Sequence, residues 1–226
     1  MTPRASSTAT PQPVPAVARP GPAEARPVPA VARPGPAEAL AELLAGNRRF
    51  VGRRPRHGHD VAAAAAASGG QQPYAVVIGC IDSRVPLEAI FDQNFGSICV
   101  VRSGGQVLDR ALLGSVEFAI SQLGVALVMV LGHERCGAVD ATVQALRSGD
   151  RPGGSLAYLV DEIAPAVTEA GLGHADVSSR ALRHHVRRTV DRLERTPAIG
   201  EAASAGRVAI VGAVYDLDTG RVDILR

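Results

Sequence analysis

Short apolar segments alternate with longer helical patterns from residue 73 onward, and this alternation restricts the fold more than any other feature of the chain. The segments that we interpret as buried strands span residues 74–81, 98–102, 126–131 and 208–213, with a last one at 222–225. The helical patterns span residues 109–123, 138–147, 155–170 and 177–195. Alternating strands and helices are typical of a mainly parallel sheet that helices cover. The sequence therefore predicts an α/β fold.

The chain ends in a pattern typical of a β-hairpin. Residues 215–225 read YDLDTGRVDIL, in which Asp218, Thr219 and Gly220 form a turn between two apolar segments. A tight reversal makes the last strand antiparallel to the one before it. We expect this strand to lie at the edge of the sheet.

The first 36 residues differ in composition from the rest of the chain. They hold ten of the 16 prolines, and residues 13–26 (PVPAVARPGPAEAR) recur almost unchanged as residues 27–40 (PVPAVARPGPAEAL). Proline at this density disfavours both helix and sheet. We predict a disordered Pro/Ala-rich tail over residues 1–36 and one folded domain over residues 37–226. Docking of the tail on a partner is the alternative.

The folded domain is expected to begin with a helical arm. Pro36 and Glu38 suit a first helical turn, and Leu40, Leu43 and Leu44 continue it as an apolar stripe. Six alanines at residues 62–67 permit a second helix, which Gly69 and Gly70 end.

Composition excludes several classes of protein. The net charge of +2, from 24 basic and 22 acidic residues, gives no basic surface typical of a nucleic-acid partner. No apolar run approaches the roughly 18–20 residues of a membrane span. Three cysteines are too few for a disulfide-built secreted scaffold, which favours the cytoplasm and metal or thiol chemistry.

Chemically reactive residues follow two of the predicted strands. Cys80, Asp82 and Arg84 come at the end of the first strand, and His133 and Cys136 follow the third. The carboxyl ends of parallel strands meet at one edge of a sheet, where reactive groups collect. Two thiols and an imidazole favour Zn²⁺, and three protein ligands leave an open position typical of catalytic zinc. A buried set without metal and a redox pair are the alternatives.

These residues resemble two signatures of the β-class carbonic anhydrases, C-x-D-x-R in CIDSR and H-x-x-C in GHERCG. The similarity extends to LLAGNRRFVG at 43–52, GQQP at 70–73, SVEFA at 115–119 and the C-terminal residues 190–225. It covers about residues 38–226. The resemblance implies a four-stranded parallel sheet with an added antiparallel edge strand and helices on both faces. It also implies a homodimer or a tetramer.

The resemblance assigns a role to each site residue. Cys80, His133 and Cys136 would bind one Zn²⁺ per chain. Asp82 would either pair with Arg84, which leaves water on the metal, or become a fourth metal ligand. Gln71 would donate its amide to the substrate. The implied reaction is the reversible hydration of CO₂ to bicarbonate and a proton, by attack of zinc-bound hydroxide on CO₂.

The chain departs from the family pattern next to the second strand. Cys99 replaces a phenylalanine that is usual there, and residues 102–106 read RSGGQ where the family has R-N-x-G-N. A smaller side chain at this place would enlarge a substrate pocket, so hydrolysis of carbonyl sulfide or carbon disulfide is an alternative activity. A catalytically silent zinc-dependent binding module is another. We expect Cys99 to pack as a small apolar residue.

The remaining histidines give weaker signals. His57 and His59 lie in a loop rich in Pro and Arg, and no proton shuttle can be assigned to them. In the helix predicted over residues 177–195, an apolar face should contact the sheet, and we place His184 and His185 on its polar face. The apolar face consists of Ala181, Leu182, Val186, Val190 and Leu193.

Overall fold

The computed structural model describes residues 33–225 and contains one five-stranded sheet in the order β2-β1-β3-β4-β5. Its strands are β1 (Ala75–Cys80), β2 (Ile98–Ser103), β3 (Leu127–His133), β4 (Ala209–Tyr215) and β5 (Val222–Leu225). The first four strands are parallel to their neighbours, and β5 runs antiparallel to β4. The predicted four-stranded parallel sheet with an antiparallel edge strand is confirmed. The main difference is that β3 and β4 end two residues later than we expected.

Eight α-helices connect or precede these strands in the described part of the chain. They are α1 (Pro36–Val51), α2 (Val61–Ala67), α3 (Leu87–Ile90), α4 (Arg110–Ser121), α5 (Gly137–Ser148), α6 (Leu156–Ala170), α7 (Val177–Arg195) and α8 (Pro197–Ser204). Our sequence reading missed α3, α8 and a short 3₁₀ turn, η1 (Gly104–Gln106). Pro197 stops α7 and starts α8, because proline fits the first turn of a helix and not its interior.

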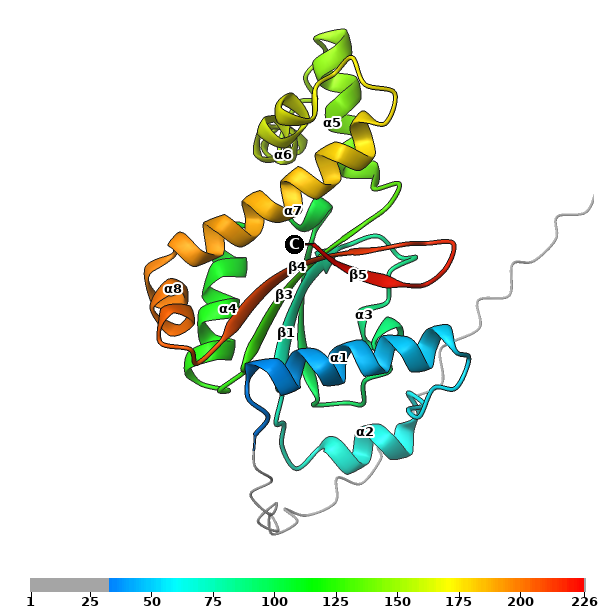
Figure 1. Ribbon diagram of the computed structural model, residues 1–226, viewed down its shortest axis with the longest axis vertical. Coiled ribbons are helices and arrows are strands. Elements are labelled where there is room, and N and C mark those ends of the chain that lie inside the picture. Colours follow the sequence, from blue (N-terminus) through cyan, green and yellow to red (C-terminus); the bar gives the residue numbers. More distant parts are fainter. Residues whose placement is uncertain (1–32, 226) are drawn as a thin grey trace, which may run out of the picture. The chain divides into compact units, whose positions relative to one another are not determined.

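The sheet separates two apolar cores, and helices cover both of its faces (Figure 1). One core joins alternate residues of β1, such as Val76 and Ile78, to helices α4 to α8. The other joins Val77 of β1 and Met129 of β3 to α1 and α3. Side chains alternate between the faces of a strand, so β1 and β3, buried on both faces, must be apolar throughout. The prediction of helices on both faces is confirmed.

Helix α1 is the expected N-terminal helical arm, and the polar side chain of Asn47 fixes it to the domain. Its amide Nδ2 donates to the carbonyl oxygens of Ile90 (3.2 Å) and Gly220 (2.9 Å), and its Oδ1 accepts from the backbone N–H of Val222 (3.1 Å). The helix begins at Pro36, inside the second copy of the sequence repeat. The predicted disordered tail lies outside the described residues up to residue 32.

Helix α7 confirms most of its predicted apolar face but corrects the position of one histidine. Ala181, Leu182, Val186 and Leu193 are buried. His185 was placed on the polar face, yet only 4% of it is exposed. His185 is buried because residues three and four apart share one face of a helix, which places it with residues 182, 186 and 189 on the buried face. His184 keeps the expected outward position, where its Nδ1 lies 3.3 Å from Oε2 of Glu169.

No helix in the described range 33–225 is long and apolar enough to cross a membrane.

Candidate metal centre

The three predicted metal ligands meet at the carboxyl end of two neighbouring parallel strands. Cys80 is the last residue of β1, His133 is the last residue of β3, and Cys136 directly precedes α5. Their sulfur and nitrogen atoms all lie within 4.8 Å of one another. The three residues are 4%, 0% and 2% exposed, so the cluster is enclosed by protein.

The imidazole of His133 is oriented for metal binding. Its Nδ1 lies 3.0 Å from the carbonyl oxygen of Glu134, and a carbonyl can only accept, so Nδ1 carries the proton. Nε2 therefore holds the lone pair, and this buried atom has no hydrogen-bond partner among the described residues. Metal-binding histidines commonly donate their second ring nitrogen in this way. A cation at Nε2 would satisfy the unpaired atom.

The two thiols also favour a cation. The Cys136 thiol donates a hydrogen bond to the Cys80 thiolate, which lowers the pKa of Cys80. The same hydrogen bond raises the pKa of Cys136, whose proton makes it. A second thiolate beside the first requires a compensating positive charge. Two thiolates and one neutral imidazole are a donor set that Zn²⁺ prefers, so the residues fit this metal.

Asp82 and Arg84 form a two-pronged ion pair beside the cluster. Nε of Arg84 lies 3.0 Å from Oδ1 of Asp82, and Nη2 lies 2.7 Å from Oδ2. The backbone N–H of Arg84 donates to the same Oδ1 at 2.9 Å. These bonds hold the pKa of Asp82 well below its usual range, since they stabilise the carboxylate form. Asp82 Oδ2 lies 3.9 Å from Nε2 of His133, so the pair borders the metal position.

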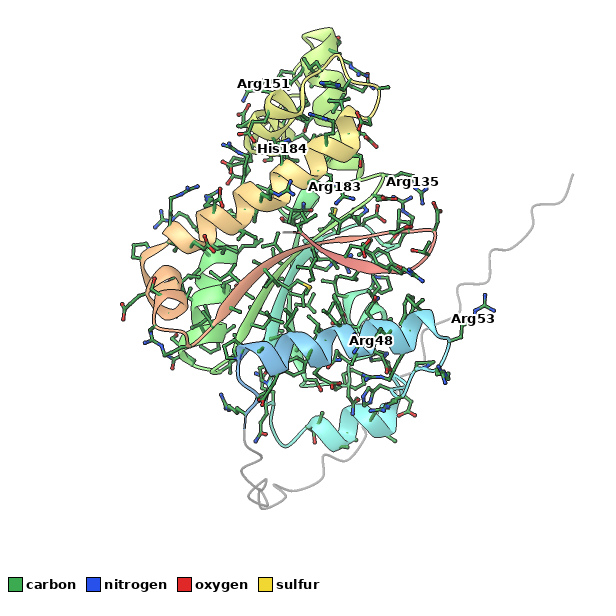
Figure 2. The ribbon with its side chains drawn as sticks, viewed as in Figure 1. Arg48, Arg53, Arg135, Arg151, Arg183 and His184 are labelled. Carbon is green, nitrogen blue, oxygen red and sulfur yellow. The ribbon has the colours of Figure 1, made fainter. Side chains whose placement is uncertain are left out.

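The Arg84 side chain is held at a second point. Its Nη2 donates to the carbonyl oxygen of Arg135 at 3.2 Å. Arg135 has a positive φ of 51°, which is uncommon for a residue with a side chain. Its guanidinium is bound at 2.8 Å to both carboxylate oxygens of Asp218 in the turn between β4 and β5, near which Arg135 lies (Figure 2). The hairpin thus supports the carbonyl that Arg84 uses.

Arg102 of β2 is a site residue that our sequence reasoning missed. Its Nε donates to the carbonyl oxygen of Cys80 (2.8 Å) and its Nη2 to that of Asp82 (2.7 Å). These bonds fix the segment that carries both residues. The only sequence signal was an arginine at the end of the strand that neighbours β1.

A cavity of about 390 Å³ opens beside the cluster. Cys80 and Asp82 contribute to its wall, together with apolar side chains of Ile81, Leu156 and Leu159. It can therefore admit a small apolar molecule next to the metal ligands.

The structure places two other residues away from the cluster. Gln71 is exposed and precedes β1, whereas Cys80 is the last of the six residues of that strand, so the length of β1, about 20 Å, lies between them. Cys99 lies in β2 and lines a groove next to α4, and it is not one of the three clustered ligands. His57 and His59 lie in the loop before α2, where Nε2 of His59 is 3.0 Å from the carbonyl oxygen of Gln93.

The fold and the cluster together define a class of protein, an α/β zinc enzyme with a Cys₂His site. Residues 75–222 match the family model described as carbonic anhydrase. Carbonic anhydrase 2 of Mycobacterium tuberculosis is 46% identical over 188 residues, which cover 81% of this chain and 89% of that protein. The carbonic anhydrase of Mycolicibacterium smegmatis is 42% identical, over 82% of this chain and 91% of that protein. The chain belongs to the carbonic anhydrase family.

Solved structures agree on the fold. A β-carbonic anhydrase from Coccomyxa superimposes with a TM-score of 0.65 at 23% identity, covering 82% of this chain and 86% of that chain. A tetrameric β-carbonic anhydrase from Sordaria macrospora gives the same TM-score, 0.65, over 82% and 96% of the two chains. The predicted family, the zinc cofactor and zinc-dependent hydration of CO₂ are confirmed. Neither a carbonyl sulfide or carbon disulfide hydrolase nor a silent binding module is favoured.

Proposed function

We propose that this carbonic anhydrase works with an open zinc site in which Asp82 and Arg84 are the catalytic pair. The observation that supports this most strongly is the double hydrogen bond from Arg84, which engages both carboxylate oxygens of Asp82. The ligand cluster of the described chain contains Cys80, His133 and Cys136 but not Asp82. Three protein ligands leave one position of a tetrahedral zinc for solvent.

Each residue of the pair has a separate task. A Zn²⁺ ion held by Cys80, His133 and Cys136 would lower the pKa of a bound water from about 15.7 toward about 7. Asp82, held ionised by Arg84, accepts a hydrogen bond from this water and so orients it toward CO₂. The apolar wall of the 390 Å³ cavity receives CO₂, which has no charge to be solvated.

Stopped-flow measurement of CO₂ hydration, with zinc content determined on the same sample, tests this function. We expect one zinc per chain and rapid hydration of CO₂, with little turnover of carbonyl sulfide. Zinc-loaded protein that turns over carbonyl sulfide faster than CO₂ would instead support the alternative hydrolase activity.

Gln71 lies too far from Cys80 to act at the metal site of its own chain. One chain cannot bring this exposed amide to its own metal, because β1 lies between them. We therefore propose that Gln71 serves the site of a second copy of the chain and donates its amide to CO₂ there. This role requires at least a homodimer.

The free edge of the sheet offers a surface for that second copy. Within the described residues β2 pairs only with β1, so its outer backbone groups have no strand partner. A groove of about 580 Å³ runs along β2 and α4, and Phe118, which is 55% exposed, lies in its wall. Unpaired strand edges and exposed apolar patches are typical of interfaces.

An experiment that mixes two variants distinguishes a site that needs Gln71 of a second chain from a site that one chain completes alone. Asp82→Asn and Gln71→Ala chains are each expected to be slow alone. In a hybrid dimer, the Gln71→Ala chain keeps Asp82 and receives Gln71 from the other chain, so one site is complete. If CO₂ hydration recovers after the mixture is unfolded and refolded, the result supports the action of Gln71 at the site of a second chain. Activity equal to the average of the two variants would show that Gln71 does not act across chains.

We also propose that the enzyme works in the cytoplasm. Its three cysteines are free, and the two at the metal centre must stay reduced to bind zinc. Fractionation of cells that express the protein tests this location.

A further inference from the structure

The 3₁₀ turn η1 brings a backbone N–H against a metal ligand. The N–H of Gly105 donates to Sγ of Cys80 at 3.3 Å. Gly105 has a φ of +62°, and an added Cβ would lie 2.9 Å from Cδ1 of Ile163 and 3.0 Å from Cβ of Ala138. Only glycine permits this approach without displacing its neighbours.

A residue 80 positions further along the chain holds this turn in place. His185 of α7 lies with Nε2 at 2.8 Å from the carbonyl oxygen of Gly105. The oxygen can only accept, so Nε2 carries the proton and donates it. Burial lowers the pKa of His185, which keeps the ring neutral. Thr189 in turn donates its hydroxyl to the carbonyl oxygen of His185 at 2.8 Å, within the same helix.

We propose that His185 is a positioning residue for the metal ligand Cys80. It fixes Gly105, and Gly105 fixes the thiolate through the N–H···S bond. The same bond withdraws charge from the sulfur, so that Cys80 donates less electron density to the metal. A zinc that receives less charge from its ligands is a stronger Lewis acid. His185 thereby links α7, which supplies no metal ligand, to the chemistry of the site.

The first test uses the wild-type protein with ¹¹³Cd in place of zinc. A scalar coupling between cadmium and the amide proton of Gly105 is expected, because the hydrogen bond to Cys80 connects them. Absence of that coupling overturns the proposal. The measurement needs only a metal on Cys80, so it is independent of the roles assigned to Asp82, Arg84 and Gln71.

Two substitutions separate the hydrogen bond from simple packing. His185→Gln keeps an N–H near the position of Nε2, and His185→Leu fills similar space without a donor. We expect His185→Leu to lose the coupling and to release zinc to a chelator about 10-fold faster, the lower end of effects for residues that support metal ligands. His185→Gln should retain both properties. His184→Leu, on the exposed side of α7, is the matched control and should match the wild type.

The results for the two His185 variants can support or overturn the proposal. Zinc release and coupling unchanged in folded His185→Leu protein would overturn the proposal. Equal losses of coupling and of bound zinc in His185→Gln and His185→Leu would show that only the shape of the imidazole matters. That result would also overturn the proposal. If His185→Leu does not fold, the test uses the cadmium–amide coupling in the wild type and in His185→Gln. A coupling present in both supports the proposal, and its loss in His185→Gln overturns the proposal.

Discussion

Asp82 has two possible positive partners, the Arg84 guanidinium and a metal ion, and we therefore propose that Arg84 controls the state of the metal site. The carboxylate now bonds to Arg84 at 2.7 and 3.0 Å, while its Oδ2 is 3.9 Å from the metal-facing Nε2 of His133. A small rotation of Asp82 would therefore bring it onto a metal bound by Cys80, His133 and Cys136. The side chain of Arg84 is 52% exposed, so its effect comes from geometry rather than from burial.

Replacing Arg84 by alanine should close the site. The released Asp82 carboxylate is expected to take the open position on zinc, and CO₂ hydration should fall by about 100-fold or more with zinc still bound. A crystal structure of the zinc-loaded variant should show a carboxylate oxygen of Asp82 on the metal in place of water. A wild-type rate in zinc-loaded Arg84→Ala protein would contradict this control by Arg84.

Asp82→Asn should slow the enzyme for a different reason. The amide cannot supply the charged acceptor that orients the water, but it also has little tendency to bind zinc. We expect a rate loss of about 10- to 100-fold with the water position still open. Crystal structures of the two zinc-loaded variants distinguish an open slow site, with water on the metal, from one that Asp82 closes.

At the scale of elements, α1 depends on the rest of the domain through Asn47. The buried side chain satisfies three backbone groups, which belong to Ile90, Gly220 and Val222. It thereby connects the N-terminal helix to α3 and to the β4–β5 hairpin, far from it in the sequence. Water cannot easily replace this side chain, since only 5% of Asn47 is exposed.

Asn47→Ala should destabilise the fold without affecting the metal centre. Buried backbone groups left unpaired cost about 1–3 kcal/mol, so we expect a fall in melting temperature of about 2–12 °C for a domain of this size. Zinc content should stay at the wild-type value, because Asn47 contacts none of the ligands. Arg48→Ala, exposed on the same helix (Figure 2), is the control and should change the melting temperature little. An unchanged melting temperature in Asn47→Ala would contradict the anchoring role.

At the scale of the whole molecule, assembly is proposed to depend on the edge strand β2 and the groove beside it. Phe118→Glu places a charge in that groove, which should cost more in a dimer than in a single chain. We expect the variant to sediment as a monomer and to lose CO₂ hydration, because Gln71 of a second chain is then absent. Leu172→Glu, at a position 36% exposed outside the groove, should leave the assembly unchanged. A dimer that persists in Phe118→Glu would place the interface elsewhere.

Residues 1–32, which precede the described part of the chain, should be dispensable for the folded domain. Their composition cannot form a packed core, so removal of residues 1–32 should leave the zinc content and the melting temperature nearly unchanged. Calorimetry and metal analysis of the shortened chain measure both. A large loss of either would instead indicate that the repeat docks on the domain.

The sequence by itself determined the strands, most of the helices and the clustering of Cys80, His133 and Cys136. Periodicity is a local property, so the strands and the long helices could be predicted, as could the placement of Cys80 and His133 at neighbouring strand ends. Features that depend on contacts across the chain could not be predicted. Arg102 reaches carbonyls of another strand, and α3 is too short to show a helical period.

The surroundings of His185 and of Gln71 both depend on packing across the chain. His185 reads as polar, and only packing of α7 against the turn at Gly105 shows that it is buried and bonded. Gln71 lies in a motif that suggests substrate contact, yet the length of β1 keeps it away from its own metal ligands. A sequence records which groups are available, whereas their mutual distances arise only when the sheet and its helices pack. The cluster of Cys80, His133 and Cys136 was therefore predictable from local pattern, whereas the residues that surround it were decided by the tertiary structure.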